Sequence, residues 1–491
     1  MKLMKGASWD SLFLTVVKLV TTLTAIIQTK ILSVGLSLTD YGTYSQANVV
    51  VSLGTSFLLL GLGDAINYFY NDSKQENDEN KKNQIINTIY GIELIAGILF
   101  ILIVVLGRYG IATYFSNDAL IPLMFIIAFQ PMLDNMIYFY QILFVSTGKA
   151  KLIALRNLII SISKLAIITL AVKVFNNILV IYILLIALNL VQLYIFAVYF
   201  KKEGFSINPI KIKWQFIHKI LAYAIPMGIF TITTALTRDI DKLVIGYMSN
   251  TETVAVYSNC SKLLPLDIIV ASFATVLIPY IMKYVSIDDK SNAAKLFKNY
   301  LKVGYYSVWT FGVGILIVTS QAITFLYSSE YLIGKPVFII YIIDSMVKFA
   351  SMHLVLTASG NSKLLMKYSI VSLIANTALN ILLFKTIGLA GPALATLIVT
   401  LIYSIMIMRK TIKILGVKWA DVLGIKDILL FIITLVICGA LFSVVNRELL
   451  KLGLNQYIAM IMTMGGFGIL VLVINIKKIM NVFKAINSLR V

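Results

Sequence analysis

Charged residues are scarce in this chain, and their scarcity excludes a soluble globular protein. Only 13% of the 491 residues are Asp, Glu, Lys or Arg, whereas soluble domains average about 25%. Hydrophobic residues make up 59% of the sequence, and its mean hydropathy is +0.91. A chain of this length and composition can cross a membrane many times, so we expect an integral membrane protein.

Acidic residues, cysteine and histidine are also few. The 22 acidic residues stand against 42 basic ones, which gives a net charge of +20. We assign this excess to cytoplasmic loops and expect no nucleic-acid partner. Cys260 and Cys438 lie far apart in apolar stretches, so no disulfide framework is indicated. His218 and His353 have no Cys or carboxylate at ligand spacing, so we expect no metal site.

The sequence also lacks the features of an enzyme. No GxxxxGK[ST] pattern is present, so direct use of ATP is not expected. A membrane-embedded polymerase or ligase acting on lipid-linked sugars usually needs a sizeable outer loop, and the predicted outer loops here have only about 5 to 18 residues. We therefore expect a protein without a catalytic site or an organic cofactor.

Apolar windows of about 20 residues recur along the whole chain, and each is long enough for a helix to cross a bilayer. They predict an all-α integral membrane protein with about 14 transmembrane helices. The predicted spans are Trp9–Val34, Tyr41–Tyr68, Ile85–Gly107, Ala119–Ser146, Leu152–Val174, Ile178–Phe200, Ile217–Tyr247, Thr253–Met282, Phe297–Thr319, Pro336–Ser359, Leu364–Thr386, Leu389–Met408, Asp427–Val445 and Gln456–Ile474.

The basic residues in the connections predict the orientation. With the N-terminus inside, about 29 Lys and Arg residues fall in inner segments and about 6 in outer ones, a strong positive-inside pattern. We expect a multi-pass protein of the cytoplasmic (inner) cell membrane with both termini in the cytoplasm. Lys2 and Lys5 precede an apolar stretch longer than a signal-peptide core, which we interpret as a retained first helix.

An internal repeat divides the chain. The residues from Lys30 (KILSVGLSLTDYGTYS) match those from Lys242 (KLVIGYMSNTETVAVYS), and those from Asp134 match those from Asp344. An offset of roughly 212 residues indicates duplication of a six-helix unit. Parallel lobes of this kind place a solute site between them and work by rocking. We expect two pseudo-symmetric lobes at 1–200 and 217–412, an interfacial linker at 201–216, and two additional helices with a tail at 413–491.

The stretch from Thr231 to Ser258 carries the densest charge inside a predicted span. At helical spacing Thr231, Thr234, Arg238 and Asp241 share one face. Charges inside a membrane are costly and usually mark a pathway, so the stripe predicts a solute pathway. The alternative is a self-neutralised cluster in which Arg238 pairs with Asp241, and Asp239 pairs with Lys242, at i,i+3.

Further buried cations lie in other predicted spans. The first offers Ser11, Thr15, Lys18, Thr22 and Thr29 on one face, the eighth offers Lys262 and Asp267, and the tenth offers Asp344 and Lys348. An alternative for Lys30, Lys242 and Lys262 is that they snorkel to the outer interface. Arg156 and Lys164 fit equally well as structural partners of Asp134.

Several segments resemble the multidrug/oligosaccharidyl-lipid/polysaccharide (MOP) exporter superfamily. The run ANTALNILLFKTIGLAGPALATLIVT (Ala375 to Thr400) is similar to its helix eleven to twelve hairpin. The turns STGKAKL and SGNSKLL, and the segment GLGDAINYFYND, look like its polysaccharide-exporter branch. The resemblance covers the whole chain and points to a Wzx-type flippase.

Such a flippase would move an undecaprenyl-diphosphate-linked oligosaccharide from the inner to the outer leaflet, for capsule or O-antigen assembly. Membrane lipids and the polysaccharide polymerase machinery are the partners that this implies. A diphosphate needs cations in a wet cavity, for which we select Lys18, Lys30, Arg238, Lys242, Lys262 and Lys348. Asp239, Asp241 and Asp344 are candidates for balancing charge or for coupling Na⁺ or H⁺.

By resemblance, the two C-terminal helices help to form a groove for the polyprenyl tail. The alternatives within the superfamily are a cation-coupled multidrug or metabolite antiporter and a lipid II flippase. An antiporter of this type carries a coupling carboxylate in its first-lobe cavity, whereas the first span here has Lys18 at mid-span and only Asp10 near its cytoplasmic end.

Overall fold

The computed structural model describes residues 2–63, 65–66, 68–69, 79–147, 149–205, 207–262, 264, 266 and 268–488, with side chains from residue 16 onward. All regular secondary structure in this part of the chain is helical. The chain divides into two compact units, Met1–Val256 and Tyr257–Val491. The predicted all-α fold is confirmed, whereas the division into lobes by sequence repeat stays a prediction.

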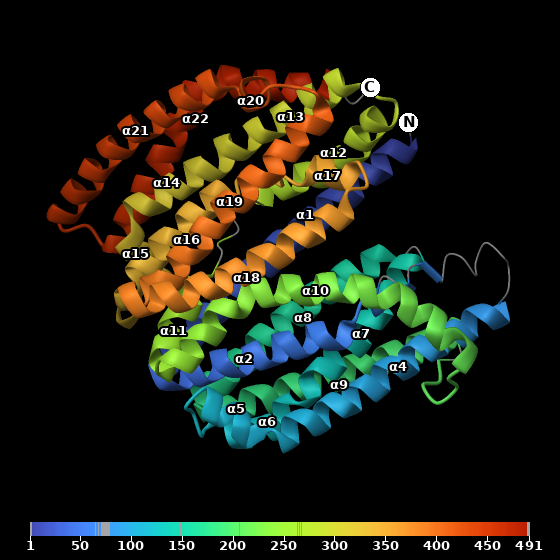
Figure 1. Cartoon of the computed structure of the whole chain (residues 1–491). Helices are drawn as coiled ribbons and strands as arrows, with labels where there is room; N and C mark the ends of the chain where they lie inside the picture. The colour runs from blue at the N-terminus through green and yellow to red at the C-terminus, as the bar shows by residue number, and fades with distance from the viewer. Residues whose placement is uncertain are drawn as a thin grey trace. The chain divides into compact units, whose positions relative to one another are not determined.

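The described part of the first unit consists of helices that follow one another along the chain (Figure 1). They are α1 (Lys2–Gly35), α2 (Leu38–Leu59), α4 (Glu79–Leu106), α5 (Arg108–Tyr114), α6 (Leu120–Ile127), α7 (Phe129–Ser146), α8 (Ala150–Leu170, extended by the π turn Ala171–Phe175), α9 (Ile178–Lys202), α10 (Trp214–Met248) and the start of α11 (Thr251–Cys260).

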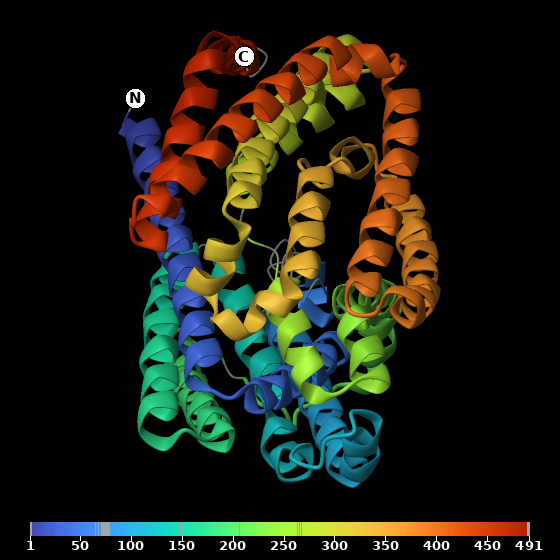
Figure 2. The same ribbon diagram turned by 90° about the vertical axis from the view of Figure 1, so that its left-hand side faces the viewer.

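The second unit begins inside α11 and ends in two long helical hairpins. Its helices are α12 (Ile268–Ser286), α13 (Lys290–Gly304), α14 (Thr310–Ile317), α15 (Thr319–Leu326), α16 (Lys335–Val347), α17 (Leu354–Ala358), α18 (Ser362–Ile387), α19 (Ala390–Leu415), α20 (Trp419–Leu423), α21 (Ile425–Lys451) and α22 (Gln456–Ser488). Helices α18 and α19 pack side by side, as do α21 and α22 (Figure 2).

Ten helices of the described chain are long and apolar enough to cross a membrane, and the bent pair Lys290–Ile317 and Thr319–Leu326 would be an eleventh. Each of the fourteen predicted windows does contain helix. Three fall short of the span criterion for local reasons: α2 is rich in polar residues, α11 and α12 are separate helices, and α16 has only 13 residues.

Large apolar side chains cover the outside of the long helices. On α4 they include Ile98, Leu102 and Leu106, which are 48–75% exposed, and α21 and α22 carry similar rows. A water-soluble protein does not expose apolar surface on this scale. Because helices satisfy their own backbone hydrogen bonds, these faces can lie directly in hydrocarbon. The molecule is therefore a multi-pass membrane protein.

An ion pair holds the turn between α7 and α8. In the STGKAKL turn, Lys149 Nζ lies 2.6 Å from the Glu203 carboxylate and donates a hydrogen bond of 2.8 Å to Tyr199 Oη. The hydrogen bond with Glu203 raises the pKa of Lys149, and the same bond lowers the pKa of Glu203. The start of α8 is thus tied to the end of α9.

Glycines let α10 cross the end of α2 with backbone against backbone. A Cβ added at Gly228 would lie 2.5 Å from the Leu60 carbonyl carbon, and one added at Gly61 would lie 2.3 Å from the Ala224 carbonyl oxygen. Gly61 also has a φ of +72°, which favours glycine. The approach places the middle of α2 beside the charged stretch of α10.

We expect Gly228→Ala to destabilise the protein, because the added methyl group forces α10 away from Leu60. Overpacking of this kind costs about 1–3 kcal/mol. Thermal unfolding in detergent should show a lower midpoint than wild type. The matched control is Gly468→Ala on α22, where an added Cβ meets nothing within 4 Å. Equal midpoints for the two variants would contradict the close crossing.

Candidate functional site

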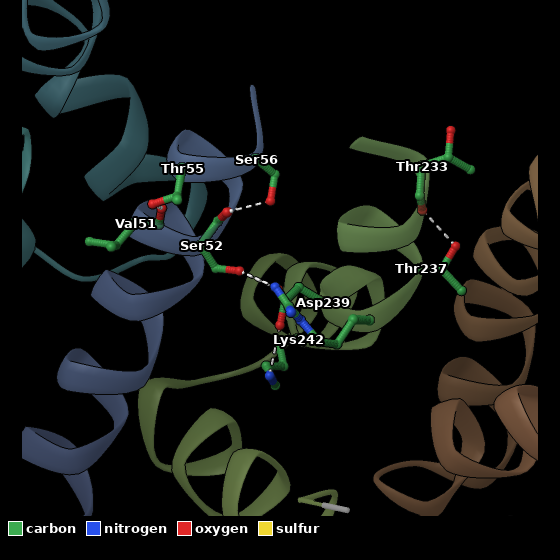
Figure 3. A network of polar contacts seen from close by, with 9 residues as sticks. Val51, Ser52, Thr55, Ser56, Thr233, Thr237, Asp239 and Lys242 are labelled. Carbon is green, nitrogen blue, oxygen red and sulfur yellow. Dashed lines mark hydrogen bonds and ion pairs between the residues drawn. The ribbon is translucent and has the colours of Figure 1, made fainter. Parts of the chain in front are cut away.

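A buried carboxylate organises the charged stretch of α10 (Figure 3). Asp239 is 3% exposed. Its Oδ1 accepts from Lys242 Nζ at 2.8 Å, and its Oδ2 accepts from Ser52 Oγ of α2 at 2.8 Å. Arg238 Nη2 lies 3.2 Å from the same Oδ2 and also donates to Ser52 Oγ. Two cations and one hydroxyl therefore share a single carboxylate.

Arg238 lies on the face of α10 opposite the exposed apolar side chains. Ile229 and Tyr247 are each nine residues from Arg238, which places both on roughly the opposite face at 100° per residue. Those two side chains are 47% and 66% exposed, whereas Arg238 carries a side chain that is 63% exposed on its own face. Its Nη1 has no hydrogen-bond partner in the described structure. The guanidinium is therefore fixed on one edge and accessible on the other.

The pairing differs in part from the self-neutralised alternative. The predicted pair of Asp239 with Lys242 is present, but the predicted pair of Arg238 with Asp241 is wrong. Arg238 contacts the adjacent Asp239 instead, because that carboxylate faces α2 and Ser52 draws the guanidinium toward it. Asp241 is buried at 3% exposure and makes other contacts.

Helix α1 has the same division into faces. Lys18 is exposed and forms no ion pair in the described structure. Thr22 Oγ1 donates to the Lys18 carbonyl oxygen at 2.8 Å, so the two residues share a face. Ile27, nine residues from Lys18 and 47% exposed, lies roughly opposite. The predicted stripe therefore points away from the apolar surface, although Ser11 and Thr15 have side chains outside the described residues.

A third face of α1 packs on α8. Thr24 Oγ1 shares a short hydrogen bond with Ser161 Oγ, and Gln28 Nε2 donates to the Ser161 carbonyl oxygen at 3.0 Å. This contact fixes the rotation of α1 about its axis. Lys30, further along α1, is half-buried.

The second unit holds the remaining candidates in two separate places. Lys348 Nζ lies 2.6 Å from Asp344 Oδ2, and the Asp344 residue is fully buried. Lys262 is exposed in the turn after α11. Asp267 lies outside the described residues.

Two polar networks contain amide side chains that were not predicted as site residues. In the first unit, Asp134 Oδ1 accepts from Gln130 and Asn189 at 2.9 Å each, and Gln192 links Asn189 to Arg156. Asn189 and Gln192 are spaced i,i+3 in a largely apolar helix, and this spacing predicts that the two amide side chains lie on one face. In the second unit, Asn380 donates to Asn376, and Asn376 donates to Thr396, at 2.8 and 3.1 Å. The ANTALN motif supplies both asparagines.

The exposed charged groups among the predicted site residues of the first unit are cationic. Within the described residues, no group of three or more His, Cys, Asp or Glu side chains could hold a metal ion. Arg238 and Lys18 carry exposed N–H donors of the kind that anions accept, whereas the amide side chains of the two networks are buried.

The sequence is similar to those of known proteins. Residues 9–285 match the family model described as polysaccharide biosynthesis protein. A protein named probable lipid II flippase MurJ, from Rickettsia prowazekii, is 24% identical over 242 residues, which are 45% of this chain and 43% of that protein. The match thus spans less than half of the relative's length.

Solved structures agree on the fold. The lipid II flippase MurJ in an inward closed conformation aligns with a TM-score of 0.75 at 15% identity, over 94% of this chain and 97% of that one. An inward-facing multidrug resistance MATE family transporter of the MOP superfamily aligns with a TM-score of 0.70 at 12% identity, over 81% and 94%. Because the family model covers more than half of the sequence, the chain belongs to the polysaccharide biosynthesis protein family.

Proposed function

We propose that the protein is a Wzx-type flippase, which moves an undecaprenyl-diphosphate-linked oligosaccharide from the inner to the outer leaflet of the cytoplasmic membrane. The proposal rests on the exposed guanidinium group of Arg238. A membrane helix has no structural need for a guanidinium that is 63% exposed, whereas a diphosphate headgroup crossing a membrane needs such a group. Asp239 and Ser52 hold it in one orientation, so little entropy is lost when it binds an anion.

Lys18 extends the cationic surface of the first unit. Lys18 has no carboxylate partner among the residues whose side chains are described, and an unpaired ammonium group inside a predicted span is costly in hydrocarbon. We therefore expect water to reach Lys18. The polar stripe that it shares with Thr22 supplies hydroxyl groups for sugar. In this proposal Lys30, Lys242, Lys262 and Lys348 add to the positive potential, and Asp241 and Asp344 remain candidates for ion coupling.

An apolar groove of about 750 Å³ in the second unit suits the polyprenyl tail. Trp309, Val313, Ile343, Leu401, Ile432 and Val436 represent the helices that line it. Helix α21, the first of the two additional C-terminal helices, forms one wall. The predicted contribution of α22 is not seen in the lining, which draws on α14, α16, α19 and α20 instead. A tail needs only apolar contact, which these side chains provide.

We expect Arg238→Ala and Lys18→Ala each to reduce flipping to near background, because a diphosphate loses a charge-assisted partner in either variant. The assay follows a fluorescent polyprenyl-diphosphate oligosaccharide across reconstituted proteoliposomes. Lys451→Ala is the control, since Lys451 is an exposed surface lysine paired with Glu448. Wild-type rates in both test variants, with equal protein insertion, would remove the role of these cations.

The groove yields a second test on α21. Ala440 lines the groove, whereas exposed Ile437 on the same helix does not. Ala440→Trp should fill the groove and slow flipping of a long-chain polyprenyl substrate severalfold, with a smaller effect on a short-chain analogue. Ile437→Trp should leave both rates near wild type. A chain-length-independent effect of Ala440→Trp would contradict tail binding there.

Lipid II is the second candidate substrate, and the likeness to the lipid II flippase over 94% of this chain favours it. The two substrates are chemically similar in their anionic head and lipid tail. Proteoliposomes should therefore be given each lipid in separate reactions at equal concentration. We expect faster flipping of the oligosaccharide carrier, and a preference for lipid II would reassign the substrate.

A further inference from the structure

Glu93, on α4, is a buried acid that the proposed substrate path does not use. It is 3% exposed, and neither carboxyl oxygen has a hydrogen-bond partner in the described structure. It is the one charged residue between positions 85 and 107. It also lies thirteen residues from each end of the apolar span Asn80–Leu106, or about 20 Å along the helix in either direction.

The surroundings of Glu93 are apolar and tightly packed. Tyr90, one turn before it, packs its ring on Phe139 and Tyr140 of α7. Gly97, one turn after it, allows so close an approach that an added Cβ would lie 2.3 Å from Met132. Residues three before and four after share a helix face with Glu93, so its side chain is directed at α7.

Among the described residues, no cation on the elements that pack against α4 pairs with Glu93. Helix α4 packs on α2, α5, α6, α7 and α10, and Gly91 contacts the segment at Pro209 and Ile212. The ionisable residues on these elements are Asp40, Tyr41 and Tyr44; Arg108, Tyr109 and Tyr114; Asp134, Tyr138 and Tyr140; Lys211 and Lys213; and His218, Lys219, Tyr223, Arg238, Asp239, Asp241, Lys242 and Tyr247.

Several charged groups of this set are engaged in other contacts. Asp134 is bonded to Gln130 and Asn189. Lys242 is paired with Asp239, and Arg108 donates to the Val105 carbonyl oxygen and lies over two aromatic rings. An ionised Glu93 would therefore be a buried charge without a counter-ion, which proteins avoid by neutralising the group.

We propose that Glu93 is a proton-binding site of the first unit. With α4 packed on α7, the carboxyl group holds a proton and is neutral. It releases that proton to water only when α4 separates from α7 far enough for water to reach it, and no other bond changes. Proton binding and the packing of α4 are thus linked. For a flippase the proton would serve as the driving ion, and this use rests on the proposed function.

Glu93→Gln in the full-length protein tests the site without any transport assay. Infrared spectra of the purified protein in lipid at neutral pH should contain the C=O band of a protonated carboxylic acid, and this band should be lost in Glu93→Gln. Glu448→Gln removes an exposed, ion-paired carboxylate instead and should leave the band unchanged. A band absent from wild type, or one retained in Glu93→Gln, would overturn the proposal.

The pH dependence of stability is a second readout. At neutral pH an unfolded chain has released the proton of an ordinary glutamate, whose pKa is about 4.3, while the folded protein retains it. The melting midpoint of wild type should therefore fall as pH rises, and the fall should be smaller in Glu93→Gln. Glu93→Met, an apolar variant of similar length, should fold and show the same reduced dependence. Equal pH dependence in all three proteins would overturn the site.

Transport in proteoliposomes then tests the use of the proton. A pH gradient should accelerate flipping by wild type and by Glu448→Gln but not by Glu93→Gln. If wild type flips neither lipid while Glu93→Gln still loses the infrared band, the proton site stands and the proposed function fails. If wild type flips lipid without any response to the gradient, the driving role of Glu93 is overturned.

Discussion

The ion pairing of the Asp239 carboxylate is the interaction on which the charged centre of the first unit depends. A carboxylate inside a membrane protein is tolerated when cations and hydrogen-bond donors replace its lost hydration. Lys242 and Ser52 do this at 2.8 Å each. Arg238 completes the set with one edge and keeps the other accessible. Asp239 therefore acts as the anchor of a cation, and the exposed charge belongs to its neighbour.

This anchor requires the close crossing of two helices. Ser52 reaches Asp239 because α2 and α10 approach each other at Gly61 and Gly228, where their backbones leave no room for a Cβ. In a membrane, helices gain little from burying apolar surface against each other, so small residues and polar contacts set their geometry. The glycines and the ion pair are thus two parts of one arrangement.

The two units carry different kinds of surface. The first holds the exposed cations Lys18 and Arg238, together with amide and hydroxyl networks. The second holds an apolar groove of about 750 Å³. The lipid-linked diphosphate sugar that we propose as substrate has a charged head and an apolar tail, for which these surfaces are candidates. Membership in the polysaccharide biosynthesis protein family is consistent with such a solute, and Glu93 adds an acid whose protonation depends on helix packing.

The sequence by itself determined the membrane class and the helical architecture, because hydrophobic length and charge count act locally and need no partner. It also located the charges of α10 and the pair of Asp239 with Lys242, which is set by helical spacing alone. Tertiary structure decided the rest. Arg238 contacts Asp239 rather than Asp241 because Ser52, 186 residues earlier, lies beside it. Whether a polar side chain such as Glu93 or Asn189 finds a partner depends on neighbouring helices, whose rotation about their axes is fixed only by packing.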